Sequence, residues 1–351
     1  MGPAKRANTR LATSWRSALV AVMIVPALLT GCTTLENGLG PDEGEPRLLV
    51  QPLRTIGLAR HHVDLALGRH SRGVGPAAEI APNALTNVER ACSGGRPSVT
   101  WLGHSSVILD IGGRCILTDP VLEENISPVS PLPVRLVESP VRVDDLPEID
   151  AIIISHGDYD HLHLPTIRAL SRRFPDAEVL VPPGVAGPVT LAGYPRVTRL
   201  RLDETKQIQG LSITAARAHH ETRRTPAALR TGEAFSWIVT DGRKKVLFVG
   251  DTGYGPAFSA IGRTHGPFDL LLVPIGAYEP RELVAHMHAN PEEAAQIASE
   301  VEARLAIGIH WGTFALSPDR PEDSVRRFME AGRKMDVNTR VLEIGGSISV
   351  P

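Results

Sequence analysis

The sequence lacks a strong charge of either sign. Its 37 lysine and arginine residues nearly balance its 39 aspartate and glutamate residues, so the formal net charge is −2. Nucleic-acid binding rests on a basic excess that neutralises phosphate groups, and nothing in this composition suggests such a partner. A hydrophobic content of 42% is ordinary for a globular protein, and 351 residues suffice for one large domain with appendages or for two small domains.

Near its N-terminus the sequence lacks an apolar run of the about 20 residues that a membrane-spanning helix needs. The run at 17–29 follows four basic residues and leads into Leu-Thr-Gly-Cys at 29–32. This order is typical of a signal peptide, and 29–32 resembles a bacterial lipobox, in which the thiol of Cys32 would carry diacylglycerol. We expect a signal peptide at 1–31 and an exported, membrane-anchored lipoprotein of the bacterial cell envelope, facing the periplasm or at the outer membrane. The alternative is an ordinary secretion signal that ends near a cysteine.

Cysteine is scarce as well. Besides Cys32 the chain has only Cys92 and Cys115. Export would allow these two to form a disulfide, whereas a buried free thiol agrees equally well with the position of Cys115 inside an apparent strand. The sequence leaves both states open.

Composition changes at about residue 96. Residues 32–95 begin with a stretch rich in glycine, proline and acidic residues, so we interpret them as a lipid-anchored tether followed by an N-terminal extension. The histidines of this extension have no spacing known from metal motifs, and we expect them on a solvated or membrane-facing surface. The compact domain is expected at 96–351.

From residue 97 onward, short apolar segments alternate with turns and helical segments, which indicates an α/β (α+β) domain. We expect strands at 98–102, 106–111, 114–118, 151–155, 211–217, 235–240, 245–249, 270–274, 305–309, 341–344 and 347–350. We expect helices at 164–174, 290–302 and 321–332. The second of these begins with Asn290, then proline and two glutamates, which is a favourable helix start.

Four of these strands stop at side chains that can bind a metal ion. The apolar run 151–154 leads into 156–161, which contains two histidines and two aspartates. The other three strands lead to His219, Asp251 and His310. Sheet proteins assemble sites at strand ends, and neutral imidazole combined with carboxylate suits zinc, iron or manganese. The pattern therefore predicts a metal site.

The motifs and their order allow a family to be named. The segment 156–161 matches H-x-[H/D/E]-x-D-H, and further motifs lie at 100–105, 117–120, 250–254, 275–281, 288–294 and 309–316. The chain resembles the metallo-β-lactamase superfamily. Within it, the chain is similar to the branch of the N-acylphosphatidylethanolamine-hydrolysing phospholipase D. The resemblance implies a four-layer αββα sandwich.

The resemblance also implies two divalent metal ions. Their ligands would be His156, Asp158 and His219 for the first ion, Asp160, His161 and His310 for the second, and Asp251 as the bridge between them. Asp158 stands where the branch usually has histidine. A carboxylate is a harder donor, so iron or manganese joins zinc as a candidate metal.

Further residues are expected around the metals. His220, next to His219, is expected to line the pocket. His288 would stabilise charge on the phosphate or on the leaving oxygen, and it joins Asp160 and Asp251 as an expected catalytic residue. Three more residues each have a structural alternative to a role in the site: His104, Asp119 and Tyr278.

His104 would approach the metals or make a structural hydrogen bond. Asp119 would orient a ligating imidazole or stabilise the turn before Pro120. Tyr278 would face the same pocket or pack in the core.

The activity implied is phosphodiester hydrolysis of the phospholipase D type, with a hydroxide between the metals as nucleophile. The substrate would be an N-acylphosphatidylethanolamine-like phospholipid, which an anchor at Cys32 would keep close. Because many hydrolases share the fold, a hydrolase of another ester, lactone or amide, of lactonase or β-lactamase type, is one alternative. A non-catalytic metal-binding envelope lipoprotein is another, and the seven ligand-type residues argue against it.

Overall fold

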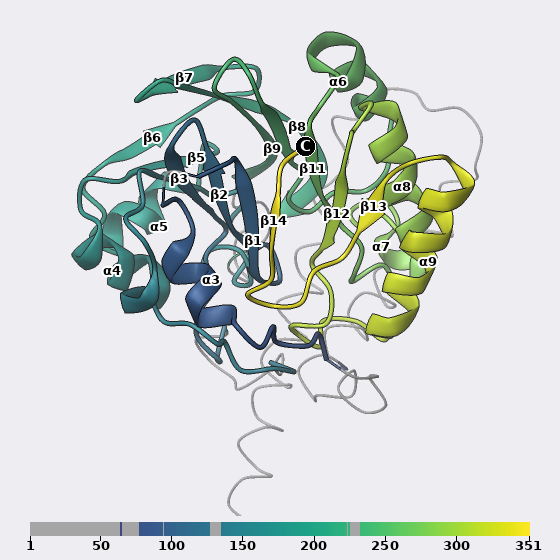
Figure 1. Ribbon diagram of the computed structural model, residues 1–351, viewed down its shortest axis with the longest axis horizontal. Coiled ribbons are helices and arrows are strands. Elements are labelled where there is room, and N and C mark those ends of the chain that lie inside the picture. The colour runs from purple at the N-terminus through teal and green to yellow at the C-terminus, as the bar shows by residue number, and fades with distance from the viewer. Residues whose placement is uncertain (1–63, 65–76, 94, 127–134, 223, 225–231) are drawn as a thin grey trace, which may run out of the picture.

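The computed structural model describes residues 64, 77–93, 95–126, 135–222, 224 and 232–351. Two seven-stranded sheets pack face to face, and helices lie on their outer sides (Figure 1). The expected four-layer αββα arrangement is thereby confirmed. The expected signal peptide at 1–31, the expected lipidation site at Cys32 and the expected tether fall outside the described residues.

The first sheet has the order β14-β1-β2-β3-β4-β5-β6. Its strands are β1 (Ser98–Gly103), β2 (Ser106–Ile111), β3 (Arg114–Thr118), β4 (Ala151–Ile153), β5 (Glu178–Val181), β6 (Val197–Arg199) and β14 (Ser347–Ser349). The second sheet has the order β13-β12-β11-β10-β9-β8-β7. Its strands are β7 (Thr205–Ile208), β8 (Leu211–Thr222), β9 (Gly232–Thr240), β10 (Lys245–Phe248), β11 (Leu270–Pro274), β12 (Ala306–Ile309) and β13 (Thr339–Arg340).

Helices cover both outer faces because each sheet is apolar on both of its sides. The first sheet is covered by α3 (Ala84–Arg90), α4 (Leu164–Arg173) and α5 (Ala186–Leu191), and the 3-10 turn η1 (Val143–Asp145) lies beside α4. The second sheet is covered by α6 (Ala257–His265), α8 (Pro291–Glu300) and α9 (Pro321–Lys334), and the short helix α7 (Arg281–Val284) precedes α8. A third apolar cluster, which includes Trp101 and Trp237, fills the space between the sheets.

The compact domain begins earlier than the sequence suggested. Ala78 donates a backbone hydrogen bond to Gly312, Ile80 bridges to Ile344, and Val88 of α3 is fully buried. Residues 77–93 therefore pack against the rest of the fold, upstream of the expected boundary at 96. The partners of Ala78 and Ile80 lie more than 200 residues away in the sequence, so no local pattern marks these two contacts.

Two further expectations are settled by the fold. Cys92 and Cys115 form a disulfide that joins the end of the α3 segment to β3. The strand expected at 341–344 is not formed, and the strand before it is the short β13. Among the described residues, none of the helices has the length and apolar character needed to cross a membrane.

Candidate metal centre

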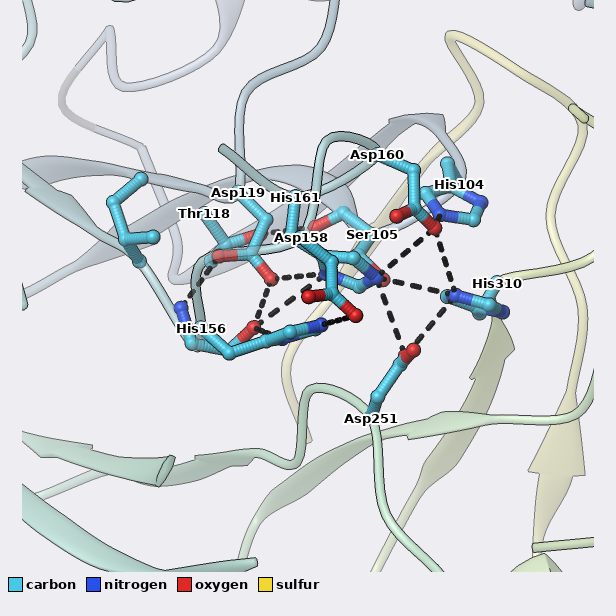
Figure 2. Close-up of polar contacts among 12 residues, drawn as sticks. His104, Ser105, Thr118, Asp119, His156, Asp158, Asp160, His161, Asp251 and His310 are labelled. Carbon is cyan, nitrogen blue, oxygen red and sulfur yellow. Dashed lines mark hydrogen bonds and ion pairs between the residues drawn. The ribbon is translucent and has the colours of Figure 1, made fainter. Parts of the chain in front are cut away.

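Ligand-type side chains from both sheets converge at one edge of the sandwich (Figure 2). The loop after β4 supplies His156, Asp158, Asp160 and His161, and the ends of β10 and β12 supply Asp251 and His310. β4 pairs in parallel with β3, and β10, β11 and β12 pair in parallel, so the carboxyl ends within each set share an edge. The convergence that the sequence predicts is found for these six residues.

Four of them form a compact group that we call the second half of the centre: Asp160, His161, Asp251 and His310. The Nε2 atom of His161 lies 3.2 Å from Nε2 of His310, 3.3 Å from Oδ1 of Asp251 and 3.5 Å from Oδ2 of Asp160. Nε2 of His310 lies 3.0 Å from Oδ1 of Asp251 and 3.7 Å from Oδ2 of Asp160. Tetrahedral ligands about 2.0–2.1 Å from a zinc ion are roughly 3.3–3.4 Å apart. The spacing of the second half therefore fits one tetrahedral metal ion.

The first half of the centre consists of His156, Asp158, His220 and the shared Asp251. Oδ2 of Asp158 lies 3.5 Å from Nε2 of His156 and 3.4 Å from Nε2 of His220. Ligand atoms of His156, His220 and Asp251 all lie within 4.8 Å of one another. Asp251 is thus the one carboxylate that both halves share, as the sequence analysis expected of the bridging ligand.

The structure places His220, and not His219, in this half. The imidazole of His219 packs against Gly255 and lies 6.4 Å, between ring centres, from Phe258 of α6. The pairing of β8 with β9 is irregular between Arg217 and Glu221, so strict alternation from the regular part of the strand does not apply there. The geometry corrects the expectation for His219 and gives its place to His220.

Hydrogen bonds turn the imidazoles so that Nε2 faces the centre. Nδ1 of His161 donates to Oδ2 of Asp119 at 2.7 Å, and Nδ1 of His220 donates to the carbonyl oxygen of Met287 at 3.1 Å. The hydroxyl of Ser155 donates to Asp119 and lies 2.9 Å from Nδ1 of His156, from which it accepts. Such contacts fix the tautomer and the orientation of a metal-binding histidine. Asp119 therefore lies where the sequence analysis expected an orienting residue.

His104 contacts a ligand-type residue. Its Nε2 atom donates to Oδ2 of Asp160 at 2.9 Å, and its ring centre lies 3.9 Å from that of His310. Burial, followed by the nearby His310, lowers the pKa of His104 to about 3, so the ring is neutral at neutral pH. Its backbone carbonyl also accepts from the amide of His310 at 2.9 Å. His104 thereby holds both Asp160 and the end of β12.

Three residues of the site have positive φ angles although they are not glycine: His104 at 52°, Asp119 at 32° and His310 at 62°. Such backbone conformations cost on the order of 1–3 kcal/mol and persist where the surrounding structure imposes them. Each of these residues directly follows a strand, where the chain turns sharply and brings the side chain towards the centre.

In the second half, the carboxylates and the imidazoles stabilise each other's charged forms. Burial lowers the pKa of His310, but the carboxylates of Asp251 and Asp160 outweigh it and raise that pKa to about 9. Burial raises the pKa of both carboxyl groups, and the facing imidazoles, His161 first, outweigh it and hold both values well below their usual range. The two carboxylates therefore attract positive charge to this point, which imidazole protons or a divalent cation can supply.

The polar atoms of the centre are arranged for coordination of a metal ion rather than for hydrogen bonds to one another. Nε2 of His156 and Oδ1 of Asp251 are buried, and neither has a hydrogen bond to any described residue. Nε2 of His161 and Nε2 of His310 face each other at 3.2 Å, although both are directed towards the same carboxylates. Buried polar atoms without partners are costly, and coordination of a cation satisfies them. The donor set of imidazoles and carboxylates suits zinc, iron or manganese.

His288 lies beside the centre and Tyr278 does not. Nδ1 of His288 is 3.7 Å from Oδ2 of Asp251, and its ring centre is 5.2 Å from that of His220. Burial lowers the pKa of His288 to about 3, although Asp251 opposes the shift. Tyr278 is buried, and its ring lies 4.8 Å below the guanidinium of Arg327 on α9. The sequence predicted that Tyr278 either faces the pocket or packs in the core, and the structure supports packing.

Three residues that hold ligands of the centre in place were not identified from the sequence. Ser155 joins Asp119 to His156, the hydroxyl of Thr222 donates to Oδ1 of Asp158 at 2.6 Å, and the carbonyl of Met287 orients His220. Ser155 directly precedes the histidine motif and was the one with a signal in the sequence. A backbone carbonyl carries no sequence signal at all.

A pocket with a volume of about 650 Å³ adjoins the first half. His220 and Thr222 line it on the side of the centre. Its other lining residues include Pro183, Leu202, Phe235, Arg217 and Glu233. Ligand pockets in proteins measure about 300–1,000 Å³, so this one has room for a small organic group or part of a lipid.

Comparisons with known proteins agree with this architecture. The family described as "Beta-lactamase superfamily domain" matches residues 114–311. An uncharacterised protein of Mycobacterium tuberculosis is 38% identical over 281 residues, which are 78% of this chain and 74% of that protein. The N-acyl-phosphatidylethanolamine-hydrolyzing phospholipase D 1 of Caenorhabditis elegans is 33% identical over 247 residues, which are 66% of this chain and 69% of that protein.

Among solved structures, a metallo hydrolase from the archaeon Ignicoccus hospitalis superposes with a TM-score of 0.56 at 20% identity. The match covers 73% of this chain and 99% of that one, and it supports the fold. Family and fold are those of metal-dependent hydrolases. The chain belongs to the metallo-β-lactamase superfamily, in the branch related to the N-acylphosphatidylethanolamine-hydrolysing phospholipase D.

Proposed function

We propose that this protein is a dinuclear metal-dependent phosphodiesterase of the phospholipase D type. Its substrate would be an N-acylphosphatidylethanolamine-like lipid, cleaved to phosphatidic acid and an N-acylethanolamine. The observation that carries the proposal is the pair of ligand sets that share Asp251. His156, Asp158 and His220 would complete the first set, and Asp160, His161 and His310 would complete the second.

Two cations held there would lower the pKa of a bound water and neutralise charge on the phosphoryl oxygens. The protein's own residues prepare the site for that chemistry. Asp119, Ser155 and Met287 fix the imidazoles, and His104 fixes Asp160. Because these contacts exist before any substrate arrives, the ligands need little reorganisation during the reaction.

His288 is placed to act on the substrate. Hydrolysis forms a bond between phosphorus and a water oxygen and breaks the bond from phosphorus to the oxygen of the N-acylethanolamine. That leaving oxygen must gain a proton, and charge on it must be stabilised until it does. His288 is the neutral imidazole beside Asp251, 3.7 Å away, and we assign it this stabilising role.

Support for a phosphodiester substrate comes from the relative in C. elegans, whose name states that activity. The 650 Å³ pocket beside His220 offers room for the N-acylethanolamine part of the substrate. A lipid anchor at Cys32, as the sequence predicts, would hold the enzyme next to a substrate in the membrane and raise its effective concentration.

The proposal is tested with the full chain purified and loaded separately with zinc, manganese or iron. Vesicles that contain N-acylphosphatidylethanolamine should yield free N-acylethanolamine and phosphatidic acid in equal amounts, detected by mass spectrometry. D251A serves as the control for contaminating activity. Turnover of a lactone, a β-lactam or a simple ester, with no N-acylethanolamine released, would show another hydrolase. Fewer than about one metal ion per chain after reconstitution would contradict the dinuclear centre.

A further inference from the structure

The segment between α7 and α8 contributes two groups to the centre. One is the imidazole of His288, and the other is the carbonyl of Met287, which accepts from Nδ1 of His220 at 3.1 Å. Neighbouring residues on one chain therefore supply a group beside Asp251 and the acceptor that orients His220. The position of this short segment matters for both.

The segment is held mainly through its backbone. The amides of Met287 and His288 both donate to the carbonyl of Val284 at 2.8 Å, and the amide of Ala289 donates to the carbonyl of Thr252 at 2.6 Å. The carbonyl of His288 accepts a hydrogen bond from a side chain, Nη1 of Arg281, at 2.7 Å. Arg281 thus binds the segment at His288, the residue whose imidazole lies in the site.

Arg281 is itself fixed by an acidic residue of α8. Its Nη2 atom donates to both carboxylate oxygens of Glu293 at 2.9 Å. Oε2 of Glu293 also accepts from the amide of Asn290 at 2.8 Å, and Oδ1 of Asn290 accepts from the amide of Glu293 at 2.8 Å. This reciprocal capping box anchors the start of α8, so the guanidinium links a fixed helix end to the carbonyl of His288.

We propose that Arg281 is a positioning residue of the metal centre, acting through the segment 287–288 on His220 and His288. The inference rests on the proposed function, in which His220 is a ligand of the first half. It explains why an arginine is needed here. The planar guanidinium presents donors in a rigid fork, so one end can bind Glu293 while the other binds a carbonyl. The single ammonium group of lysine cannot hold both partners in that geometry.

A purely structural role, in which Arg281 only secures α8, is the competing explanation. The chain offers a matched control for it. Arg327 of α9 binds Glu292, the residue before Glu293 on the same helix, with Nε to Oε1 at 2.9 Å and Nη2 to Oε2 at 2.6 Å. The side chains of Arg281 and Arg327 are 27% and 28% exposed. The pairs are alike in chemistry and in exposure of the arginine, and only that of Arg281 contacts the segment at the centre.

The first experiment needs no metal. The variants R281K and R327K of the full chain are prepared metal-free, and histidine imidazoles are followed by ¹⁵N–¹H NMR. In the wild type, His220 should show a protonated Nδ1 whose hydrogen exchanges slowly, because it donates to Met287. R281K should speed this exchange by about tenfold or more, a loss on the order of 1.4 kcal/mol. R327K should leave it near the wild-type rate. An unchanged His220 signal in R281K, or an equal change in both variants, would overturn the inference.

The second experiment measures metal affinity with Co²⁺, whose visible absorption reports coordination. R281K should weaken the binding of one of two equivalents by about 10- to 100-fold, the usual effect of losing an outer partner of a ligand, while R327K stays within about twofold of the wild type. Equal affinities in R281K and the wild type would overturn the positioning role. If R281K fails to fold, E293Q removes the charge of the anchor with little change of shape and takes its place. A wild type that binds fewer than two Co²⁺ ions would instead contradict the proposed function, and the NMR comparison would still decide the role of Arg281.

Discussion

The two halves of the metal centre are built differently. In the second half, His310 directly follows β12, His161 lies in the loop after β4, and both imidazoles are fully buried. In the first half, His220 lies on the irregular part of β8 and depends on the carbonyl of Met287 from a distant segment. The carboxylates differ too: Asp160 is 16% exposed and bound by His104, whereas Asp158 is 27% exposed and bound by Thr222.

This difference indicates that the two halves bind a metal ion with different strengths. A buried, internally braced group of ligands binds a metal ion firmly, because few of its parts can move. A more open half, with the more exposed carboxylate of Asp158, binds less firmly and is the side on which the 650 Å³ pocket opens. We therefore expect the second half to fill first when metal is added and the first half to be the more sensitive to mutation nearby.

The residue shared by both halves should give the largest effect. D251A removes the carboxylate common to both ligand sets and leaves each half with a single carboxylate, so both metal ions should be lost. Activity should fall by roughly 10⁴-fold, the scale seen when a catalytic unit is broken. Metal analysis and kinetics on the same preparation check this. Retention of two metals by D251A would mean that the halves do not depend on a shared ligand.

Alanine variants of the neighbouring His219 and His220 test which of the two histidines belongs to the first half. H220A should lower the metal content from two ions to one and reduce activity by about 10²- to 10³-fold, because one metal's charge stabilisation is lost. H219A is the matched control, since His219 packs against Gly255, and it should keep two metals. The reverse result, with loss of metal in H219A alone, would restore the original expectation for His219.

The electrostatics of the second half predict how the metal-free protein responds to pH. The pKa of His310 is raised from an ordinary 6.5 to about 9, so the folded protein binds this proton more tightly than the unfolded chain. The resulting stability is fully present below about pH 6.5 and is lost as the pH rises through about 9, by up to about 3 kcal/mol. Urea unfolding at several pH values measures it. H310Q should weaken the dependence, and H219Q should not. Part of it should remain in H310Q, because burial lowers the pKa of His161 but Asp251 and Asp160 outweigh burial and raise that pKa well above its ordinary value.

The smallest effect is expected from Asp158, the position at which the resemblance to the branch implies histidine. D158H replaces a hard oxygen donor by imidazole and should favour Zn²⁺ over Mn²⁺ in the first half, by a shift on the order of tenfold, or about 1.4 kcal/mol. Competition between the two ions, read out by metal analysis, checks this. The second half, whose ligands are unchanged, should keep its preference and acts as the internal control.

Strand ends made most of the site predictable. His156 to His161, Asp251 and His310 each follow an apolar run, and the convergence of parallel strands turns that local pattern into a spatial one. The choice between His219 and His220 could not be made this way. It depends on the irregular pairing of β8 with β9, a property of the folded hairpin that neither strand's sequence displays.

The edges of the domain were less predictable for a related reason. Residues 77–93 lack a firm apolar period, and their place on the domain comes from contacts with Gly312 and Ile344, far along the chain. The orientation of Tyr278 likewise follows from the position of Arg327 on the last helix. Long-range packing, unlike helix capping at Asn290, leaves no local mark in the sequence.

The disulfide between Cys92 and Cys115 has a mechanical consequence. A pull on the chain from upstream of residue 77 would first peel away α3 and would then stop at Cys92, because the load passes through the covalent bridge into β3. With the thiols reduced, the same pull would continue into β1, the strand that directly precedes His104. Oxidation of one pair of thiols therefore insulates the catalytic edge of the sandwich from tension on the N-terminal segment.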